Sequence, residues 1–243
     1  MNVNVKRLLI ALVLSVCIFI PANSATVDEV IGYYSSLDSS SCKPPVQAFI
    51  NAIYANYKNG PYVGYPNRFD TSNNSYWDAR DFGFVCAHGN RWLFALSGGY
   101  VNFASSSFGS SSSKGWGNVD MEWAVIYSCL VVASPLEVTN WYSVWIDEPY
   151  DVFDRLHIVN GFRTSAWVYC ADDVATNYAQ RLNGGGEVLD SWFDAIFSKG
   201  DFGNGWDRGC SVYYGTCEHD KVNSYASDPS ETKESDFHVM YIN

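Results

Sequence analysis

The chain has 243 residues, of which 16% are aromatic and 17% charged, and its formal net charge is −11. A chain this acidic repels phosphate backbones, and nucleic acid is therefore not expected as a partner. The low charged fraction and high aromatic fraction predict one large ordered core and argue against intrinsic disorder.

The first 24 residues have the layout of a secretory signal peptide. Lys6-Arg7 form a short basic start, Leu8–Ile20 is an apolar run, and small residues lead to a cleavage site after Ser24. The run is shorter than the roughly 20 residues that a membrane span needs, although an uncleaved anchor is the alternative. The sequence therefore predicts a signal peptide over residues 1–24, a single domain over 25–243, no transmembrane domain after cleavage, and a secreted, extracellular or cell-surface location. The oligomeric state stays open.

Apolar patterns along the rest of the chain predict strands that alternate with helices. A serine- and glycine-rich segment, Ser105–Gly117, is expected to be a mobile loop. The central strands are continuous apolar runs, which is typical of a mostly parallel sheet covered by helices on both faces. The expected fold class is α/β, a three-layer α-β-α sandwich. Strands are predicted over 27–36, 82–87, 123–129, 156–162, 209–215 and 237–243, and helices over 44–60, 173–182 and 188–197.

Two reactive side chains follow neighbouring central strands. His88-Gly89 comes after the run that ends at Ala87, and Cys129 ends the next apolar run. Ligands of such sheets bind beyond the carboxyl ends of the strands. An imidazole can take the proton of a thiol nucleophile, and glycine lets a substrate backbone approach and offers an N–H group to an oxyanion. The pattern predicts a catalytic His88–Cys129 dyad.

This order, a strand ending in His-Gly followed by a strand ending in Cys, resembles the clan CD cysteine peptidases, which include caspases, legumains, gingipains and clostripain-like enzymes. The chain is also similar to an uncharacterised family of prokaryotic secreted proteins with an HG…C…GF pattern. The resemblance implies a caspase-like fold, His88 and Cys129 as the dyad, and the N–H groups of Gly89 and Cys129 as the oxyanion hole. It also implies that the segment after the 156–162 strand helps build the substrate pocket. Arg163 and Trp167 are the candidate substrate-binding residues of this segment, and the alternative for Arg163 is an ordinary surface arginine.

Six cysteines follow the signal peptide, and an even number outside the cell favours disulfide bonds. A free nucleophile leaves an odd number, so Cys86 is expected to be a second free thiol and Cys210–Cys217 the favoured bridge. A Cys86–Cys129 bridge is the alternative, and it would remove the dyad. No Cys/His spacing of a zinc site occurs, so no metal and no cofactor are expected.

The sequence thus predicts a secreted cysteine peptidase or amidase that cleaves peptide or protein substrates. The alternative is a non-catalytic cell-surface binding or structural protein that retains the fold. Asp81 lies at the far end of the strand from His88 and is not expected to orient it. The other histidines, His157, His219 and His238, are expected to be structural or exposed.

Overall fold

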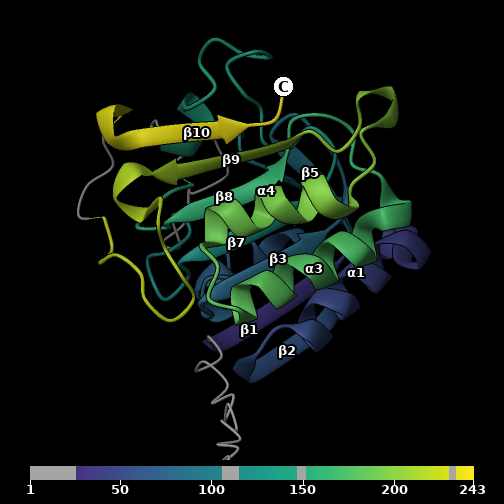
Figure 1. Ribbon diagram of the computed structural model, residues 1–243, viewed down its shortest axis with the longest axis horizontal. Coiled ribbons are helices and arrows are strands. Elements are labelled where there is room, and N and C mark those ends of the chain that lie inside the picture. The colour runs from purple at the N-terminus through teal and green to yellow at the C-terminus, as the bar shows by residue number, and fades with distance from the viewer. Residues whose placement is uncertain (1–25, 106–114, 147–151, 230–233) are drawn as a thin grey trace, which may run out of the picture.

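The computed structural model describes residues 26–105, 115–146, 152–229 and 234–243 (Figure 1). The predicted signal peptide, residues 1–24, lies outside the described residues, as do residues 106–114 of the predicted mobile loop. No helix of the described ranges is both long enough and apolar enough to cross a membrane.

A seven-stranded sheet forms the centre of the protein, in the order β10-β9-β8-β7-β3-β1-β2 (Figure 1). The five strands from β8 to β2 are parallel. At one edge of the sheet β9 pairs antiparallel with β8, and β10 pairs antiparallel with β9. This mostly parallel sheet confirms the predicted α/β sandwich class. The strands are β1 (Val27–Tyr34), β2 (Ala55–Val63), β3 (Phe82–Cys86), β7 (Trp123–Tyr127), β8 (Ile158–Phe162), β9 (Gly209–Tyr214) and β10 (Phe237–Tyr241).

Three long helices cover one face of this sheet: α1 (Ser39–Ala52), α3 (Ala171–Asn183) and α4 (Val188–Lys199), in front of the strands in Figure 1. Phe49 of α1 stacks on Phe84 of β3 at a centroid distance of 4.7 Å. Gly32 of β1 allows close packing, because a Cβ there would lie 2.5 Å from Val46. Burial of such side chains holds the helices on the sheet at about 1.5–3 kcal/mol for each large apolar group.

The opposite face is covered by short elements and a cluster of aromatic rings. A small antiparallel sheet holds β4 (His88–Asn90), β5 (Leu93–Leu96) and β6 (Gly99–Asn102), and α2 (Ser143–Ile146) is a single turn. The rings contact one another edge to face or tilted and include Tyr33, Phe69, Trp77, Phe94, Phe103, Trp116 and Trp145. Short 3-10 helices lie at 36–38, 66–68, 73–75, 168–170, 203–205, 215–217 and 234–236.

Two sequence predictions of local structure were wrong. The helix predicted over 44–60 begins earlier, at Ser39, where Asp38 caps it by accepting the N–H of Ser41, and it gives way to the edge strand β2. Every residue of β2 is exposed or half-buried, so the strand lacks the apolar pattern that identifies a core strand. Trp116, placed in the mobile loop, is instead fully buried and donates its Nε1–H to the carbonyl oxygen of Phe69 at 2.8 Å.

Candidate functional site

His88 and Cys129 emerge at the same edge of the sheet. Strands β3 and β7 are parallel neighbours, with Cys86 paired to Tyr127 at their carboxyl ends. The chain continues through Ala87, whose N–H donates to the carbonyl oxygen of Tyr127 at 3.2 Å. His88 and Cys129 then line one cavity of about 200 Å³. The structure thus brings the two predicted catalytic side chains to one cavity.

Gly89 is held against the turn that presents Cys129. A Cβ at this position would lie 2.0 Å from Oγ of Ser128 and 2.8 Å from the carbonyl oxygen of Cys129. No side chain fits such a gap without movement of backbone atoms. Glycine is therefore required here for the close approach of the two segments, in addition to the oxyanion role predicted for its N–H.

Cys129 lies in a tight turn at the end of β7. Leu130, directly after it, has a φ of 60°, a left-handed conformation that is uncommon outside glycine. The N–H of Leu130 donates to the carbonyl oxygen of Thr164 at 2.9 Å, which fixes the turn. The N–H of Ala166 donates to Sγ of Cys129 at 3.4 Å and sets the direction of the thiol. The half-buried Cys129 side chain is thus oriented by the segment after β8.

Asp38 is a site residue that the sequence analysis missed. Its Oδ2 lies 3.4 Å from Nε2 of His88, and the His88 side chain is 60% exposed. Hydrogen bonds from Ser41 and Ser40 lower the pKa of Asp38, so its carboxylate is ionised near neutral pH. A carboxylate beside a catalytic imidazole can hold the ring in one orientation.

The sequence feature that could have identified Asp38 is its position shortly after a strand. It follows β1, which pairs with β3 in parallel, so it belongs to the same carboxyl edge as His88. Asp81 lies at the other end of β3, where its Oδ2 accepts the N–H of Glu29 at 2.8 Å. Asp81 therefore does not orient His88, in agreement with the expectation from the sequence.

The six described cysteines are all free thiols. The Cys210–Cys217 bridge predicted from the sequence is therefore not formed in the structure, and neither is the alternative Cys86–Cys129 bridge. Burial raises the pKa of Cys86 well above its ordinary value, and burial together with Asp207 raises the pKa of Cys170 to about 12. Among these thiols Cys129 and Cys170 are half-buried and the other four are buried.

Trp167 lines the same cavity as His88 and Cys129. Its backbone N–H donates to Oδ1 of Asp207 at 2.6 Å, and its indole ring packs on that of Trp206 at a centroid distance of 3.7 Å. The indole is thus held from both the backbone and the ring. It is placed where a substrate side chain could contact it.

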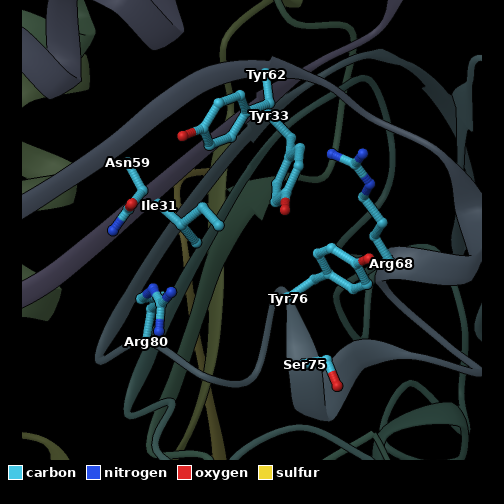
Figure 2. Close-up of a pocket in the computed structure, with 8 residues that line it drawn as sticks. All are labelled: Ile31, Tyr33, Asn59, Tyr62, Arg68, Ser75, Tyr76 and Arg80. Carbon is cyan, nitrogen blue, oxygen red and sulfur yellow. The ribbon is translucent and has the colours of Figure 1, made fainter.

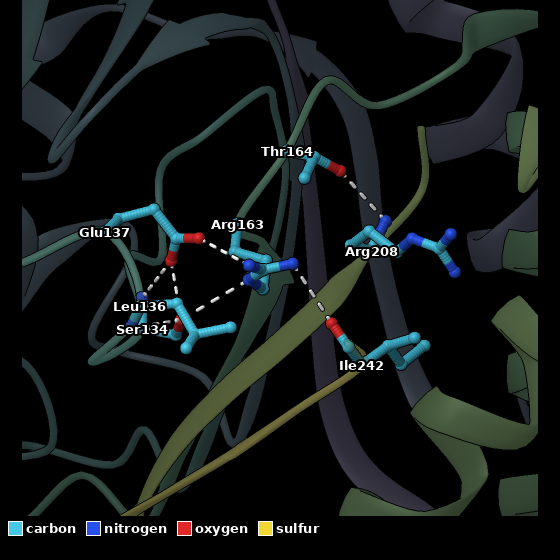
Figure 3. A network of polar contacts seen from close by, with 7 residues as sticks. All are labelled: Ser134, Leu136, Glu137, Arg163, Thr164, Arg208 and Ile242. Carbon is cyan, nitrogen blue, oxygen red and sulfur yellow. Dashed lines mark hydrogen bonds and ion pairs between the residues drawn. The ribbon is translucent and has the colours of Figure 1, made fainter. Parts of the chain in front are cut away.

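Arg163, the other predicted substrate-binding residue, lies outside that cavity in a polar network (Figure 3). Its Nη2 pairs with Glu137 at 2.6 Å, and its Nη1 donates to the carbonyl oxygen of Ile242 at 3.2 Å. Ser134 accepts from Nε at 3.3 Å. Burial opposes ionisation of Glu137, but hydrogen bonds from Ser134 and the Arg163 guanidinium outweigh it and lower the pKa of Glu137. The guanidinium thus links three chain segments, and it is not available to a substrate in the Cys129 cavity.

We expect Arg163→Met to lower the free energy of unfolding by about 2–4 kcal/mol, because it leaves the largely buried Glu137 carboxylate without its partner. The Arg163 and Glu137 side chains are only 12% and 18% exposed. Urea denaturation monitored by tryptophan fluorescence measures the change. The matched control is Arg181→Met, which breaks the more exposed pair with Asp194 and should cost less than about 1 kcal/mol. Equal effects of the two substitutions would contradict a structural role for the Arg163 network.

A second hollow, of about 350 Å³, lies beside β1 and β2 on the face of the sheet that the three long helices do not cover (Figure 2). Arg68 and Arg80 stand on different sides of it, with tyrosine rings between them. The Arg68 guanidinium lies 5.5 Å from the ring centroid of Tyr33 and 5.1 Å from that of Tyr76, within cation–π range. Arg80 pairs with Glu29 at 2.9 Å, whereas Arg68 has no carboxylate partner among the described residues. Such a lining suits an anionic group.

A second His–Cys pair, His157 and Cys217, is completely buried at the other end of the sheet, next to Asp220. No substrate reaches a thiol with no exposed surface. This pair is therefore not a candidate for the nucleophile and its base.

Comparison with known proteins gives a family and a distant structural likeness. The family model "Domain of unknown function (DUF6345)" matches residues 65–237, a range that includes His88 and Cys129. No curated protein matches the chain. The chain is similar to the structure of a secreted C11 cysteine protease from Bacteroides thetaiotaomicron, "iotapain", with 11% identity and a TM-score of 0.44. The match covers 78% of this chain and 66% of that protease's chain, and a likeness of this size says nothing about activity.

Proposed function

The chain belongs to the DUF6345 family, a domain of unknown function. We propose from the geometry of its own residues that it is a cysteine peptidase or amidase, and from the signal-peptide layout of residues 1–24 that it is exported. One observation supports this proposal above the others. His88 and Cys129 follow adjacent parallel strands and line one cavity, with Asp38 beside the imidazole. Thiol, base and carboxylate therefore line one cavity at one edge of the sheet, and these are the three kinds of group that a nucleophilic mechanism uses.

In the proposed reaction, His88 takes the thiol proton and Sγ of Cys129 attacks the carbonyl carbon of a peptide or amide bond. The carbonyl oxygen becomes an oxyanion, which the N–H groups of Gly89 and Cys129 stabilise. His88 then gives its proton to the leaving amine, and a thioester forms. A water molecule, deprotonated by His88, hydrolyses the thioester to a carboxylic acid and returns the thiol. Asp38 acts through His88 as a positioning residue.

The proposal predicts that Cys129 is the first thiol to react with an alkylating agent in the native protein. Its partial exposure and the cavity that it shares with the exposed His88 favour attack, whereas burial and Asp207 raise the pKa of Cys170 to about 12 and disfavour its thiolate. Brief iodoacetamide treatment at neutral pH, followed by peptide mass mapping, identifies the labelled residue. We expect His88→Ala to slow this labelling at least about tenfold. The control is His219→Ala, which removes a 79% exposed imidazole paired with Glu187 and should have no effect.

Labelling of Cys129 at equal rates in wild type and His88→Ala would refute the dyad. Labelling of Cys170 before Cys129 would refute the choice of nucleophile. Either result would favour the second candidate function.

That second candidate is a non-catalytic cell-surface binding protein, and the tyrosine- and arginine-lined hollow of Figure 2 favours it. Arg68 and the rings of Tyr33 and Tyr76 suit a ligand that has a carboxylate on a ring or an aliphatic body. Such binding needs neither His88 nor Cys129. Calorimetric titration with ligands of this class would show binding that Arg68→Met removes and Cys129→Ala leaves intact.

A further inference from the structure

A buried cluster of three metal-binding side chains lies at the amino ends of the strands, opposite the Cys129 cavity. His157 directly precedes β8, whose first residue pairs with Trp123 at the start of β7. Cys217 and Asp220 come from the segment after β9. The exposed fractions of His157, Cys217 and Asp220 are 0%, 0% and 2%, and one ligand atom of each lies within 4.8 Å of the others.

The partners of these side chains leave one ring nitrogen without a hydrogen bond. Nδ1 of His157 lies 2.6 Å from Oδ2 of Asp220. Nε2 faces Oδ1 of Asp228 at 3.7 Å, beyond hydrogen-bond range, and this buried atom has no partner among the described residues. Asp220 is itself fixed by Nε1 of Trp123 at 3.2 Å and by the N–H of Ala226 at 2.8 Å. A buried polar atom without a partner is costly, and the carboxylate of Asp228 is the group that Nε2 faces.

The charges around the cluster also favour a cation. Asp220 and Asp228 approach His157 from its two ring nitrogens. The imidazole thus lies between two carboxylates, with the Cys217 thiol beside it.

We propose that His157, Cys217 and Asp220 are three of the ligands of one Zn²⁺ ion. Thiolate, imidazole and carboxylate are the three ligand types that zinc prefers. Zinc bonds of about 2.0–2.3 Å in a tetrahedron place the ligand atoms about 3.2–3.8 Å apart. The three ligand atoms lie within 4.8 Å of one another, and the ion would replace the 2.6 Å contact between Nδ1 of His157 and Oδ2 of Asp220. With Nδ1 on the metal, Nε2–H points at Asp228, and a metal-bound histidine usually has such a carboxylate partner.

The role of this zinc is structural. His157 directly precedes the central strand β8, whereas Cys217 and Asp220 belong to the segment that follows β9. The described cysteines are free thiols, so no disulfide fixes this segment within the described ranges. A zinc ion would link it to the sheet and add its binding free energy to the stability of the fold. The sequence spacing gave no indication of this, because the ligands are brought together only by the fold.

Elemental analysis of the untagged full-length chain, loaded with Zn²⁺ and then dialysed, tests the proposal. We expect about one zinc per chain in the wild type and less than about a tenth as much in Cys217→Ala. The matched control is Cys210→Ala, which removes another fully buried thiol from β9 and should retain the metal. Cys129→Ala should also retain it, which separates this site from the Cys129 cavity.

A second measurement covers the case in which Cys217→Ala fails to fold. Co²⁺ in place of zinc in the wild-type chain should give a thiolate-to-cobalt charge-transfer absorption, and a chelator should lower Tm. Wild-type protein that retains no metal after loading would overturn the proposal. So would a metal content that is the same in Cys217→Ala, or a bound cobalt ion without thiolate absorption.

Discussion

We expect Cys129→Ala to abolish the proposed peptidase activity, with a fall in kcat/KM of at least about 10³. The reason is chemical: no other thiol lines the cavity with comparable exposure, since Cys42 and Cys86 are each 1% exposed. A library of fluorogenic peptides, assayed with reducing agent present, measures the change. The matched control is Cys170→Ala, which removes the other half-buried thiol and should leave turnover within about twofold.

The other two site residues give this experiment its internal test. We expect His88→Ala to cost about as much as Cys129→Ala, and the double variant to be no worse than either, because the two side chains act as a unit. Asp38→Asn should cost only about 10–100-fold, since it keeps the size of the side chain and weakens only the orientation of His88. Additive losses in the double variant, or full activity of Cys129→Ala, would show that cleavage occurs by another mechanism.

Most of the sheet could be predicted because its strands are buried on both faces. Every residue of β3, β7 and β8 is buried, and such strands give continuous apolar runs. Their ends then located His88 and Cys129. The edge strand β2 escaped because its side chains are largely exposed or half-buried, and its residues were assigned to the end of the preceding helix.

The side chains that the sequence analysis missed or misassigned have another feature in common: their contact partners are distant in the sequence. Arg163 follows a core strand and looked available, but its partner Glu137 and the carbonyl of Ile242 come from other segments. Asp38 meets His88 only through the pairing of β1 with β3. The order of strands in the sheet decides such contacts, and local patterns do not encode it.

We expect the buried carboxyl group of Asp78 to make the protein less stable as the pH rises from about 4 to about 7. This carboxyl is fully buried in the aromatic layer and accepts the N–H groups of Gly117 and Val119. Burial raises its pKa from 3.8 to about 7, against the opposing effect of those hydrogen bonds. Between these two values the folded state keeps a proton that the unfolded state has lost. The free energy of unfolding therefore falls by about 1.4 kcal/mol per pH unit from this one group, about 4 kcal/mol in all, and is level above pH 7.

Urea denaturation at several pH values, in wild type and Asp78→Asn, measures this contribution. The amide does not titrate, so the variant should show a slope with pH that is smaller by about one proton. Glu122 and Asp81, whose pKa values burial raises to about 9 and about 6, add slopes of the same sign in both proteins, and these cancel in the difference. The control is Asp173→Asn, which removes an exposed carboxylate on α3 and should leave the slope unchanged. Identical slopes in wild type and Asp78→Asn would mean that Asp78 ionises alike in the folded and unfolded states, and that its burial does not set its charge.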